Sequence, residues 1–398
     1  MEEFRKAEVR FKDQRAGQIQ ERSDGSTLFA YDDGWRTPIG CSLPVVPNIH
    51  GWRSGVHPFF QHLTAEGWLR DQQANVGSLN QEDDLGLLLR FGRDCIGAVS
   101  VHGIDGEDFT PVPPDLEPAT KAAVNSLRTI SGVQKKLLVT RDNGRYAPAG
   151  PDGPAPLIAK FNSDGIPTLV RNETLTLELA RTLLGAREVI KSANGPVGDL
   201  GHALLVERID RTDGGAKLRF EDLCQVLARP RGRRNAYKYD SSYEEAGQAI
   251  AAHSARPEID RLRFFKLVVA SALLGNCDAH LKNFSLLEGA DGLRLSPAYD
   301  IVNSVLYRGL GYSTKFALRI DGDYRQHDRV NGPLLRTLAR NLEIADRAID
   351  QAFADLRRSA DAVVTRLQKA ASVEQGSGFL NDFEQIVSAS YHRIFDNG

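Results

Sequence analysis

The chain has 398 residues, and its 50 lysines and arginines nearly balance its 52 aspartates and glutamates, giving a formal net charge of −2. Because the totals are close to neutral, they require neither nucleic acid nor an anionic membrane as a partner. The four cysteines lie far apart and form no C-x-x-C pair, which argues against a disulfide framework or a zinc site and fits a reducing cytoplasm.

Hydrophobic patterning predicts no membrane segment. The first residues, MEEFRKAEVRFKDQ, are charged and lack the apolar core of a signal peptide. No stretch approaches the ~18 consecutive apolar residues that would indicate a membrane-spanning helix. We therefore expect a cytoplasmic globular protein, long enough for two or three domains.

The N-terminal part mixes predicted strands with predicted helices. Alternating apolar residues indicate strands, and apolar residues three or four apart indicate helices. The expected elements are strands over 7–20, 26–33 and 95–103 and helices over 57–73 and 81–92. The proline-rich stretch 109–123 cannot sustain a helix until its tail, so we place a domain boundary near residues 105–120.

Strands give way to helices beyond this boundary. One helix is expected to start after Asn172, with Glu173 in its first turn and Gly185 as its stop. The other expected elements are strands over 132–140, 156–162 and 202–210, and helices over 220–228, 243–253, 261–275 and, as one long tail, 333–369. A β-rich part followed by a helical part predicts an α+β chain with a ligand cleft where the two meet.

The stretch GNCDAHLKNFSLL, residues 275–287, follows a predicted buried helix and contains a candidate catalytic loop. Asp278 and Asn283 are five residues apart, the spacing of the catalytic Asp and the Mg²⁺-binding Asn in protein kinases. Lys282 between them can neutralise phosphate charge, and Asp300 downstream supplies a second carboxylate for a metal. A solvated polar turn with a chance Asp-to-Asn spacing, and a structural role for His280, are the alternatives.

The β-rich part contains candidate phosphate-binding residues. TISGVQKKLLV has a small-residue turn at Gly132 whose backbone N–H groups can cradle phosphates, although a plain β-turn explains it equally well. Lys160 lies in an apolar strand, where a lysine needs a partner, which can be a nucleotide phosphate or Glu173. The charged stretch from Glu207 to Arg211, at the end of the strand expected over 202–210, lies where an adenine-binding hinge would fall.

These segments, in this order, resemble the HipA family of bacterial toxin serine/threonine kinases. The matching stretches are TISGVQKK, LIAKF, NETLTLELA, LLVERIDR, FEDLCQ, GNCDAHLKNFSL and LSPAYDI, with AGQI, SLP, PFFQHLTAEGWLR and GRDCIGAV near the N-terminus. The resemblance covers nearly the whole chain. It implies a two-lobed, protein-kinase-like α+β fold with a β-rich N-terminal subdomain (1–108), the rest of the N-lobe (109–215) and an all-helical C-lobe (216–398).

The resemblance also implies a role for each matching residue. Asp278 resembles the general base, Asn283 and Asp300 the Mg²⁺ ligands, and Lys160 the lysine on the ATP phosphates. The remaining expected ATP-site residues are Ser131, Gly132, Val133, Gln134, Lys135 and Lys136 of the phosphate loop, Glu207, Arg208 and Ile209 of the hinge, and His280, Lys282 and Tyr299 around the nucleotide.

Family members phosphorylate proteins, notably aminoacyl-tRNA synthetases such as glutamyl-tRNA synthetase, and so arrest translation and growth or cause persistence. A small helix-turn-helix antitoxin (HipB-like) neutralises them, and the pair represses its own operon, so operator DNA is expected to be contacted mainly through the antitoxin. No membrane partner is expected.

The chain departs from the family pattern in two places. Where family members often have an autophosphorylated serine whose phosphate ejects the loop, this chain has Thr129. The stretch ARPRGRRNAYKYDSSYEE stands in place of a glycine-rich segment, with only Lys238 and Tyr239 matching. Its basic run, Arg229 to Arg234, can be a solvated loop or can dock an acidic substrate surface or tRNA.

Two rival functions stay open at this stage. One is a scaffold whose catalysis is dispensable and which holds the antitoxin on DNA. Because Asp278, Asn283, Asp300 and Lys160 are all retained, the sequence favours an enzyme. The other is a small-molecule or phosphatidylinositol-type kinase, and the lack of an apolar or polybasic membrane-facing tail argues against it.

Overall fold

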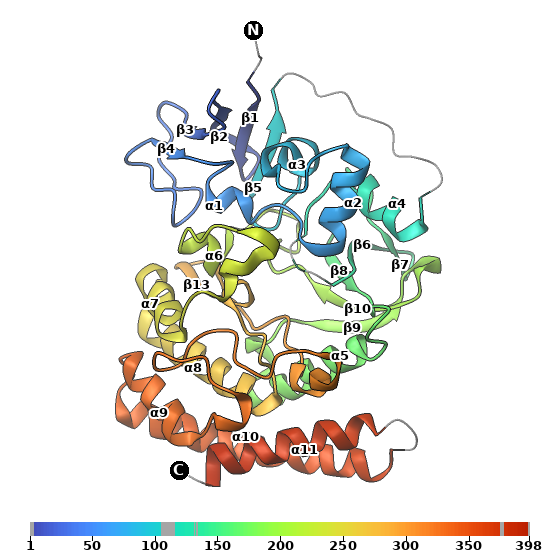
Figure 1. Cartoon of the computed structure of the whole chain (residues 1–398), viewed down its shortest axis with the longest axis vertical. Helices are drawn as coiled ribbons and strands as arrows, with labels where there is room; N and C mark the ends of the chain where they lie inside the picture. Colours follow the sequence, from blue (N-terminus) through green and yellow to red (C-terminus); the bar gives the residue numbers. More distant parts are fainter. Residues whose placement is uncertain (1–3, 105–115, 131, 133, 375–377, 397–398) are drawn as a thin grey trace. The chain divides into compact units, whose positions relative to one another are not determined.

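A computed structural model describes residues 4–104, 116–130, 132, 134–374 and 378–396 (Figure 1). The chain forms two compact units. The N-terminal unit contains Met1–Val170 and Ser192–Tyr237, and the C-terminal unit contains Arg171–Lys191 and Lys238–Gly398. The chain thus leaves the first unit, builds one helix of the second, and returns. The three-part division at residues 108 and 215 stays a prediction.

The N-terminal unit begins with a five-stranded antiparallel sheet in the order β4-β3-β2-β1-β5. Its strands are β1 (Lys6–Phe11), β2 (Gln14–Glu21), β3 (Thr27–Tyr31), β4 (Ile49–Trp52) and β5 (Val99–Gly103). Alternate residues of β1 are buried, as the sequence pattern predicts for a sheet with one covered face. Gly17 pairs with Tyr31, and a Cβ at Gly17 would lie 2.2 Å from the Ala30 carbonyl oxygen, so this pairing requires glycine.

Helices α1 (Pro58–Gln61), α2 (Gly67–Gly77) and α3 (Asp84–Phe91) connect β4 to β5. The single helix expected over 57–73 is therefore wrong. The Thr64 hydroxyl donates to the Gln61 carbonyl, and Glu66 takes an extended backbone before α2 starts, so the chain turns between the two helices. Buried leucines and phenylalanines of α1 and α3 cover the first sheet.

A second five-stranded antiparallel sheet completes this unit, in the order β7-β6-β8-β10-β9. Helix α4 (Pro118–Asn125) packs against it through Ala119 and Ala123, and helix α2 through Leu69, with Ala65 from the turn before α2. The strands are β6 (Lys136–Asp142), β7 (Arg145–Pro148), β8 (Leu157–Lys160), β9 (Ser192–Pro196) and β10 (His202–Glu207). Strand β11 (Phe220–Asp222) and helix α6 (Leu223–Val226) follow, so the helix expected over 220–228 is much shorter.

The described part of the C-terminal unit consists mainly of helices and contains the hairpin of β12 (Ser285–Gly289) and β13 (Gly292–Leu295). The expectation that the C-lobe is all-helical is therefore wrong, because strands β11, β12 and β13 lie within residues 216–398. Helix α8 (Pro257–Leu274) is buried along most of its length, because it packs against α7 (Tyr243–His253), α10 (Asp346–Ser372) and α11 (Phe379–Tyr391). An aromatic cluster of Tyr243, Phe264, Phe284 and Phe316 joins α7 and α8 to the residues that follow them.

Two helix boundaries differ from the sequence expectation. Helix α5 (Leu169–Leu184) begins before Asn172, because the Asn162 side chain accepts a hydrogen bond from the Val170 N–H and caps the first turn. Glu173 therefore lies in the second turn. The single tail helix over 333–369 is wrong: α9 (Gly332–Asn341) and α10 are separated by a turn in which Glu343 has φ 58°. None of the described helices is both long enough and apolar enough to cross a membrane.

Candidate functional site

The loop after α8 begins with a left-handed glycine. Gly275 has φ 74° and ends the helix as predicted, and a Cβ there would lie 2.5 Å from Asn303 Oδ1. The loop is held from both sides, because the Cys277 N–H donates to Ser304 Oγ (2.9 Å) and the buried Tyr243 hydroxyl donates to the Ala279 carbonyl (3.0 Å). The backbone that carries Asp278 is therefore fixed by its neighbours.

Asn283 joins the loop to the downstream acid. Its Oδ1 accepts from the His280 N–H (3.1 Å), and its Nδ2 lies 3.4 Å from Asp300 Oδ2. Asp300 has φ 57°, a strained conformation for a residue other than glycine, of the kind that clusters at functional sites. The structure thus brings Asn283 and Asp300 together although 17 residues separate them. An amide oxygen and a carboxylate are the hard oxygen donors that Mg²⁺ prefers.

Asp278 is exposed to solvent, and Tyr239 is its hydrogen-bond donor, with Oη 3.1 Å from Oδ1. Desolvation by the surrounding protein raises the pKa of Asp278 above its ordinary value, and the charge of Asp300 adds to this effect. The Lys238 charge and the Tyr239 hydrogen bond oppose it. A carboxylate with a raised pKa and an exposed position is suited to accept a proton.

The other predicted residues of this loop support its shape. Lys282 is buried, and its carbonyl accepts from the Tyr299 hydroxyl at 2.9 Å. Tyr299 also hydrogen-bonds Ser285 Oγ, which ties the segment before Asp300 to strand β12. The His280 ring packs edge-on against Tyr239, with ring centroids 5.2 Å apart. All six predicted residues of the C-terminal unit therefore lie in one network.

In the N-terminal unit, Lys136 and Lys160 are both buried and lie opposite each other in the β6–β8 register. Directly opposed residues of an antiparallel pair point to the same face of the sheet. Like charges placed in this way repel each other unless groups of opposite charge, from the protein or from a ligand, balance them. Lys136 is the first residue of β6 rather than part of a loop.

Only part of the predicted phosphate loop is described. Ser131 and Val133 lie outside the described residues. Gly132 has φ 113°, and a Cβ there would lie 2.1 Å from Lys136 Nζ, so this position requires glycine. The Gln134 Nε2 donates to the Phe161 carbonyl (2.8 Å), and Lys135 Nζ pairs with Glu117 (3.5 Å) above the Trp68 ring.

Thr129 is buried, in contrast to an accessible phosphate acceptor. Its hydroxyl donates to the Leu63 carbonyl at 2.6 Å, and its N–H donates to the Asp94 carbonyl at 3.3 Å. The Thr129 hydroxyl can therefore be phosphorylated only after the segment that contains it has moved out of its buried position.

The predicted hinge follows β10. Glu207 is exposed, and the Arg208 side chain is 1% exposed, where Asp210 (2.8 Å) and Asp94 (3.3 Å) hold it. The Arg208 N–H donates to the Pro156 carbonyl at 2.8 Å. Because the Arg208 side chain is held in this network, it is not available to contact adenine. The backbone of the segment and its neighbour Ile209 are the parts that can still form the predicted adenine-binding hinge.

The basic run is partly structural. The Arg231 side chain is 7% exposed and pairs with Glu82 (2.6 Å) and Asp84 (3.3 Å), and its N–H donates to Gln61 Oε1. The idea that Arg231 docks a substrate is therefore wrong for this structure. The side chains of Arg233 and Arg234 lie outside the described residues.

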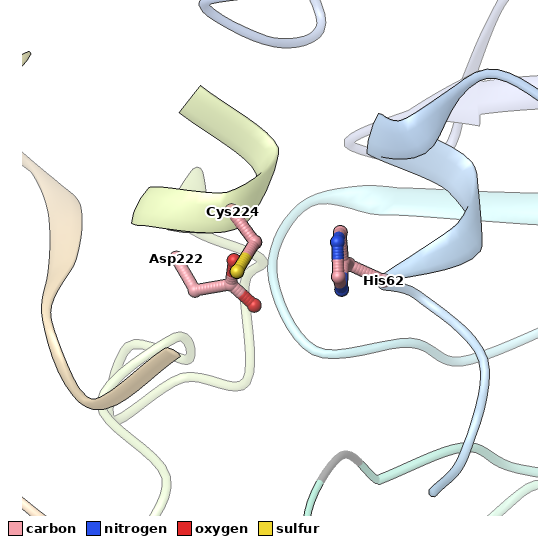
Figure 2. Close-up of side chains that lie close together, drawn as sticks. All are labelled: His62, Asp222 and Cys224. Atoms are coloured by element: carbon pink, nitrogen blue, oxygen red, sulfur yellow. The ribbon is translucent and has the colours of Figure 1, made fainter. Parts of the chain in front are cut away.

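Sequence reasoning missed what Tyr239 does. The residue was noted because it matches a family segment, but nothing in the spacing of Tyr239 and Asp278, 39 residues apart, indicates a hydrogen bond between them. It also missed a cluster of His62, Asp222 and Cys224 in the N-terminal unit, whose members are up to 162 residues apart (Figure 2).

Comparisons with family models, with known sequences and with solved structures all identify the same family. The family model described as HipA N-terminal domain matches residues 7–102, and the HipA-like C-terminal domain matches residues 128–370. The protein named "Putative kinase Y4dM" of Sinorhizobium fredii is 30% identical, over 75% of this chain and 77% of its own length. The serine/threonine-protein kinase toxin HipA of Shewanella oneidensis is 26% identical, over 49% of this chain and 47% of its own.

One solved structure covers nearly the whole chain. A chain from the Shewanella oneidensis MR-1 toxin–antitoxin complex of HipA, HipB and operator DNA superposes with a TM-score of 0.75 at 20% identity, covering 98% of this chain and 97% of the other. At this identity the likeness establishes the fold, and it confirms the predicted kinase-like α+β class. With both family models matched in order, this chain belongs to the HipA family of kinases.

Proposed function

We propose that this protein is a toxin serine/threonine protein kinase that transfers the ATP γ-phosphate to a protein hydroxyl. The observation that carries the proposal is the contact between the side chains of Asn283 and Asp300. Asn283 follows five residues after Asp278, which is exposed and has a raised pKa. This set of side chains supplies a proton acceptor and two oxygen donors in one network, which is what phosphoryl transfer needs from the protein.

Each residue then has a separate role. Asp278 accepts the proton of the substrate hydroxyl, and Tyr239 orients its carboxylate. Asn283 and Asp300 would hold Mg²⁺, whose charge neutralises the phosphate oxygens. Lys160 and Lys136 would contact the ATP phosphates, because two opposed buried lysines suit a multiply charged anion.

The biological role proposed here follows from the family. We expect the acceptor to be an aminoacyl-tRNA synthetase, such as glutamyl-tRNA synthetase, whose phosphorylation stops translation and arrests growth. The solved complex of HipA with HipB and operator DNA supports a helix-turn-helix antitoxin as partner and co-repression of the operon. Release and phosphorylation of Thr129 would silence the enzyme.

The test is incubation of the purified protein with γ-labelled ATP, Mg²⁺ and a cell lysate. We expect labelled protein bands from the wild type, none from Asp278→Asn, and wild-type labelling from Asp382→Asn, which changes an exposed acid on α11. Label confined to lipids would identify a lipid kinase instead. Equal labelling by Asp278→Asn would show that Asp278 is not the base.

A second measurement separates the toxin from the scaffold. Expression of the wild type is expected to arrest growth, and expression of Asp278→Asn is not, while both proteins bind the antitoxin equally. Growth arrest by the variant would show that toxicity does not depend on phosphoryl transfer.

A further inference from the structure

His62, Asp222 and Cys224 come together in the N-terminal unit (Figure 2), whereas Asp278, Asn283 and Asp300 belong to the C-terminal unit. Each offers one potential metal-ligand atom, and these atoms all lie within 4.8 Å of one another. All three residues are buried, with Cys224 fully so. His62 follows α1, Asp222 is the N-cap of α6, and Cys224 lies within α6. The proposed kinase mechanism uses none of them.

The His62 ring is held in a defined tautomer. Its Nε2 lies 2.7 Å from the Arg229 carbonyl oxygen, and since a carbonyl can only accept, Nε2 must carry a hydrogen. In the neutral ring, Nδ1 is then the nitrogen with the lone pair. A ring N–H donated to a backbone carbonyl is also the usual outer contact of a histidine that binds a metal.

Asp222 is positioned in a comparable way. One of its oxygens, Oδ1, accepts from the Gln225 N–H at 3.0 Å, and the Asp222 N–H donates to Gln225 Oε1 at 3.1 Å. A carboxylate has two oxygens, so this capping bond and a metal bond can coexist. The cap therefore fixes the carboxylate beside Cys224, two residues later.

The kind of ligand atoms selects the kind of metal. A nitrogen, a carboxylate oxygen and a sulfur suit Zn²⁺, whereas Mg²⁺ and Ca²⁺ take oxygen ligands. With metal–ligand bonds of roughly 2.0–2.3 Å, the ligand atoms of a tetrahedral zinc site lie roughly 3.3–3.8 Å apart. The ligand atoms of the present cluster lie within 4.8 Å of one another, so binding of zinc would draw them closer together. Bound zinc would also balance the charges of a thiolate and a carboxylate.

We propose that His62, Asp222 and Cys224 form a Zn²⁺ site that links the segment after α1 to the start of α6. The site would join the part of the chain matched by the HipA N-terminal domain to the part matched by the C-terminal domain. Hydrogen bonds already join these segments, from Ser42 Oγ to the Gln225 carbonyl (2.7 Å) and from Gln225 Nε2 to the Phe59 carbonyl (3.2 Å). The metal would add a stronger, chelator-sensitive link. The lack of C-x-x-C pairs in the sequence argues only against a zinc site built from cysteines that are close in the sequence.

The first experiment uses the full-length wild type. After purification without chelator and exhaustive dialysis, elemental analysis is expected to find about one zinc per chain. After zinc removal, Co²⁺ is added as a spectroscopic probe. A thiolate bound to Co²⁺ gives a near-ultraviolet charge-transfer band, which ions bound at the oxygen ligands Asn283 and Asp300 would not give. Substoichiometric zinc together with no such band would overturn the proposal.

Variants then test the assignment. Cys224→Ser and His62→Gln are expected to lose the zinc and the cobalt band, while Cys95→Ser, which alters another buried cysteine of the same unit, retains both. Zinc is expected to raise the melting temperature of the metal-free wild type but not that of Cys224→Ser. An unchanged band in Cys224→Ser would refute the site. If that variant does not fold, the zinc content and cobalt band of the wild type still decide the question.

Discussion

Two aspartates near opposite ends of helix α8 illustrate how one fold uses carboxylates differently. Asp260, in the first turn, is 0% exposed and accepts from Arg263, Arg294, the Ser254 hydroxyl and the Leu295 N–H. Burial alone would raise the pKa of Asp260, but these hydrogen bonds lower it to about 2. Asp278, just beyond the last turn, has one tyrosine hydroxyl as donor, and its pKa is raised.

The difference lies in the number of donors. A carboxylate with several donors is stabilised in its charged form and cannot readily accept a proton. A carboxylate with one donor, partly desolvated by the surrounding protein and near a second acid, takes up a proton more easily. We therefore assign Asp260 to the stability of the fold, and we propose Asp278 as the residue that accepts the substrate proton. Substitutions at the two positions should separate stability from activity.

The largest expected effect is the loss of kinase activity in Asp278→Asn. The amide keeps the size of the side chain but cannot accept the substrate proton, so kcat should fall by roughly 10²–10⁴-fold. Steady-state phosphorylation of the labelled protein substrate measures it. Because the charged form of Asp278 is disfavoured in the folded state, the variant should be as stable as the wild type or more so at neutral pH. A large loss of stability would contradict the comparison.

Asp260→Asn is expected to show the opposite behaviour. Loss of the charge leaves Arg263 and Arg294 without their buried carboxylate, which typically costs about 3–5 kcal/mol. Urea denaturation measures the change in the free energy of unfolding. Asp291→Asn, which removes an exposed partner of Arg256, is the matched control and should cost less than about 1 kcal/mol. If Asp260→Asn folded normally but lost kcat, our division of roles would be wrong.

The pH dependence of stability should report Asp260 directly. Its folded pKa of about 2 lies below the ordinary value of 3.8, so its stabilising contribution is complete above pH 3.8 and is lost as the pH falls toward 2. The shift corresponds to about 2 kcal/mol. The difference in unfolding free energy between wild type and Asp260→Asn should therefore shrink as the pH is lowered through this range. A difference independent of pH would show that the carboxylate charge contributes nothing.

How much the sequence could predict follows from the same comparison. The spacing of Asp278 and Asn283, the glycine that ends α8, and the order of strands and helices are local patterns, so they were predictable. Tyr239, and the donors of Asp260 that follow in the hairpin, reach their carboxylates through tertiary packing, which no local pattern encodes. The same is true of Arg208, whose partner Asp94 is 114 residues away.

Helix boundaries failed for a related reason. Periodicity continues from α9 into α10, so the sequence predicted one helix, but it cannot show that the residues around Glu343 turn to pack on the core. The start of α5 was placed too late because its cap is the side chain of Asn162, seven residues before the helix. In both cases a nonlocal or side-chain contact decided the boundary.

The smallest effect is expected from Tyr239→Phe, which removes one hydroxyl. The Tyr239 hydrogen bond lowers the pKa of Asp278 and fixes its carboxylate, so its loss should raise that pKa further and reduce kcat about tenfold, as expected for one hydrogen bond to a charged group. The acid limb of the pH–rate profile should then move to higher pH, because a larger fraction of Asp278 is protonated at a given pH. Tyr237→Phe makes the same change at an exposed residue and should leave the profile unchanged. A fall in kcat without movement of the acid limb would mean that Tyr239 acts only on the shape of the loop, and Asp278 would then owe its reactivity to desolvation and Asp300 alone.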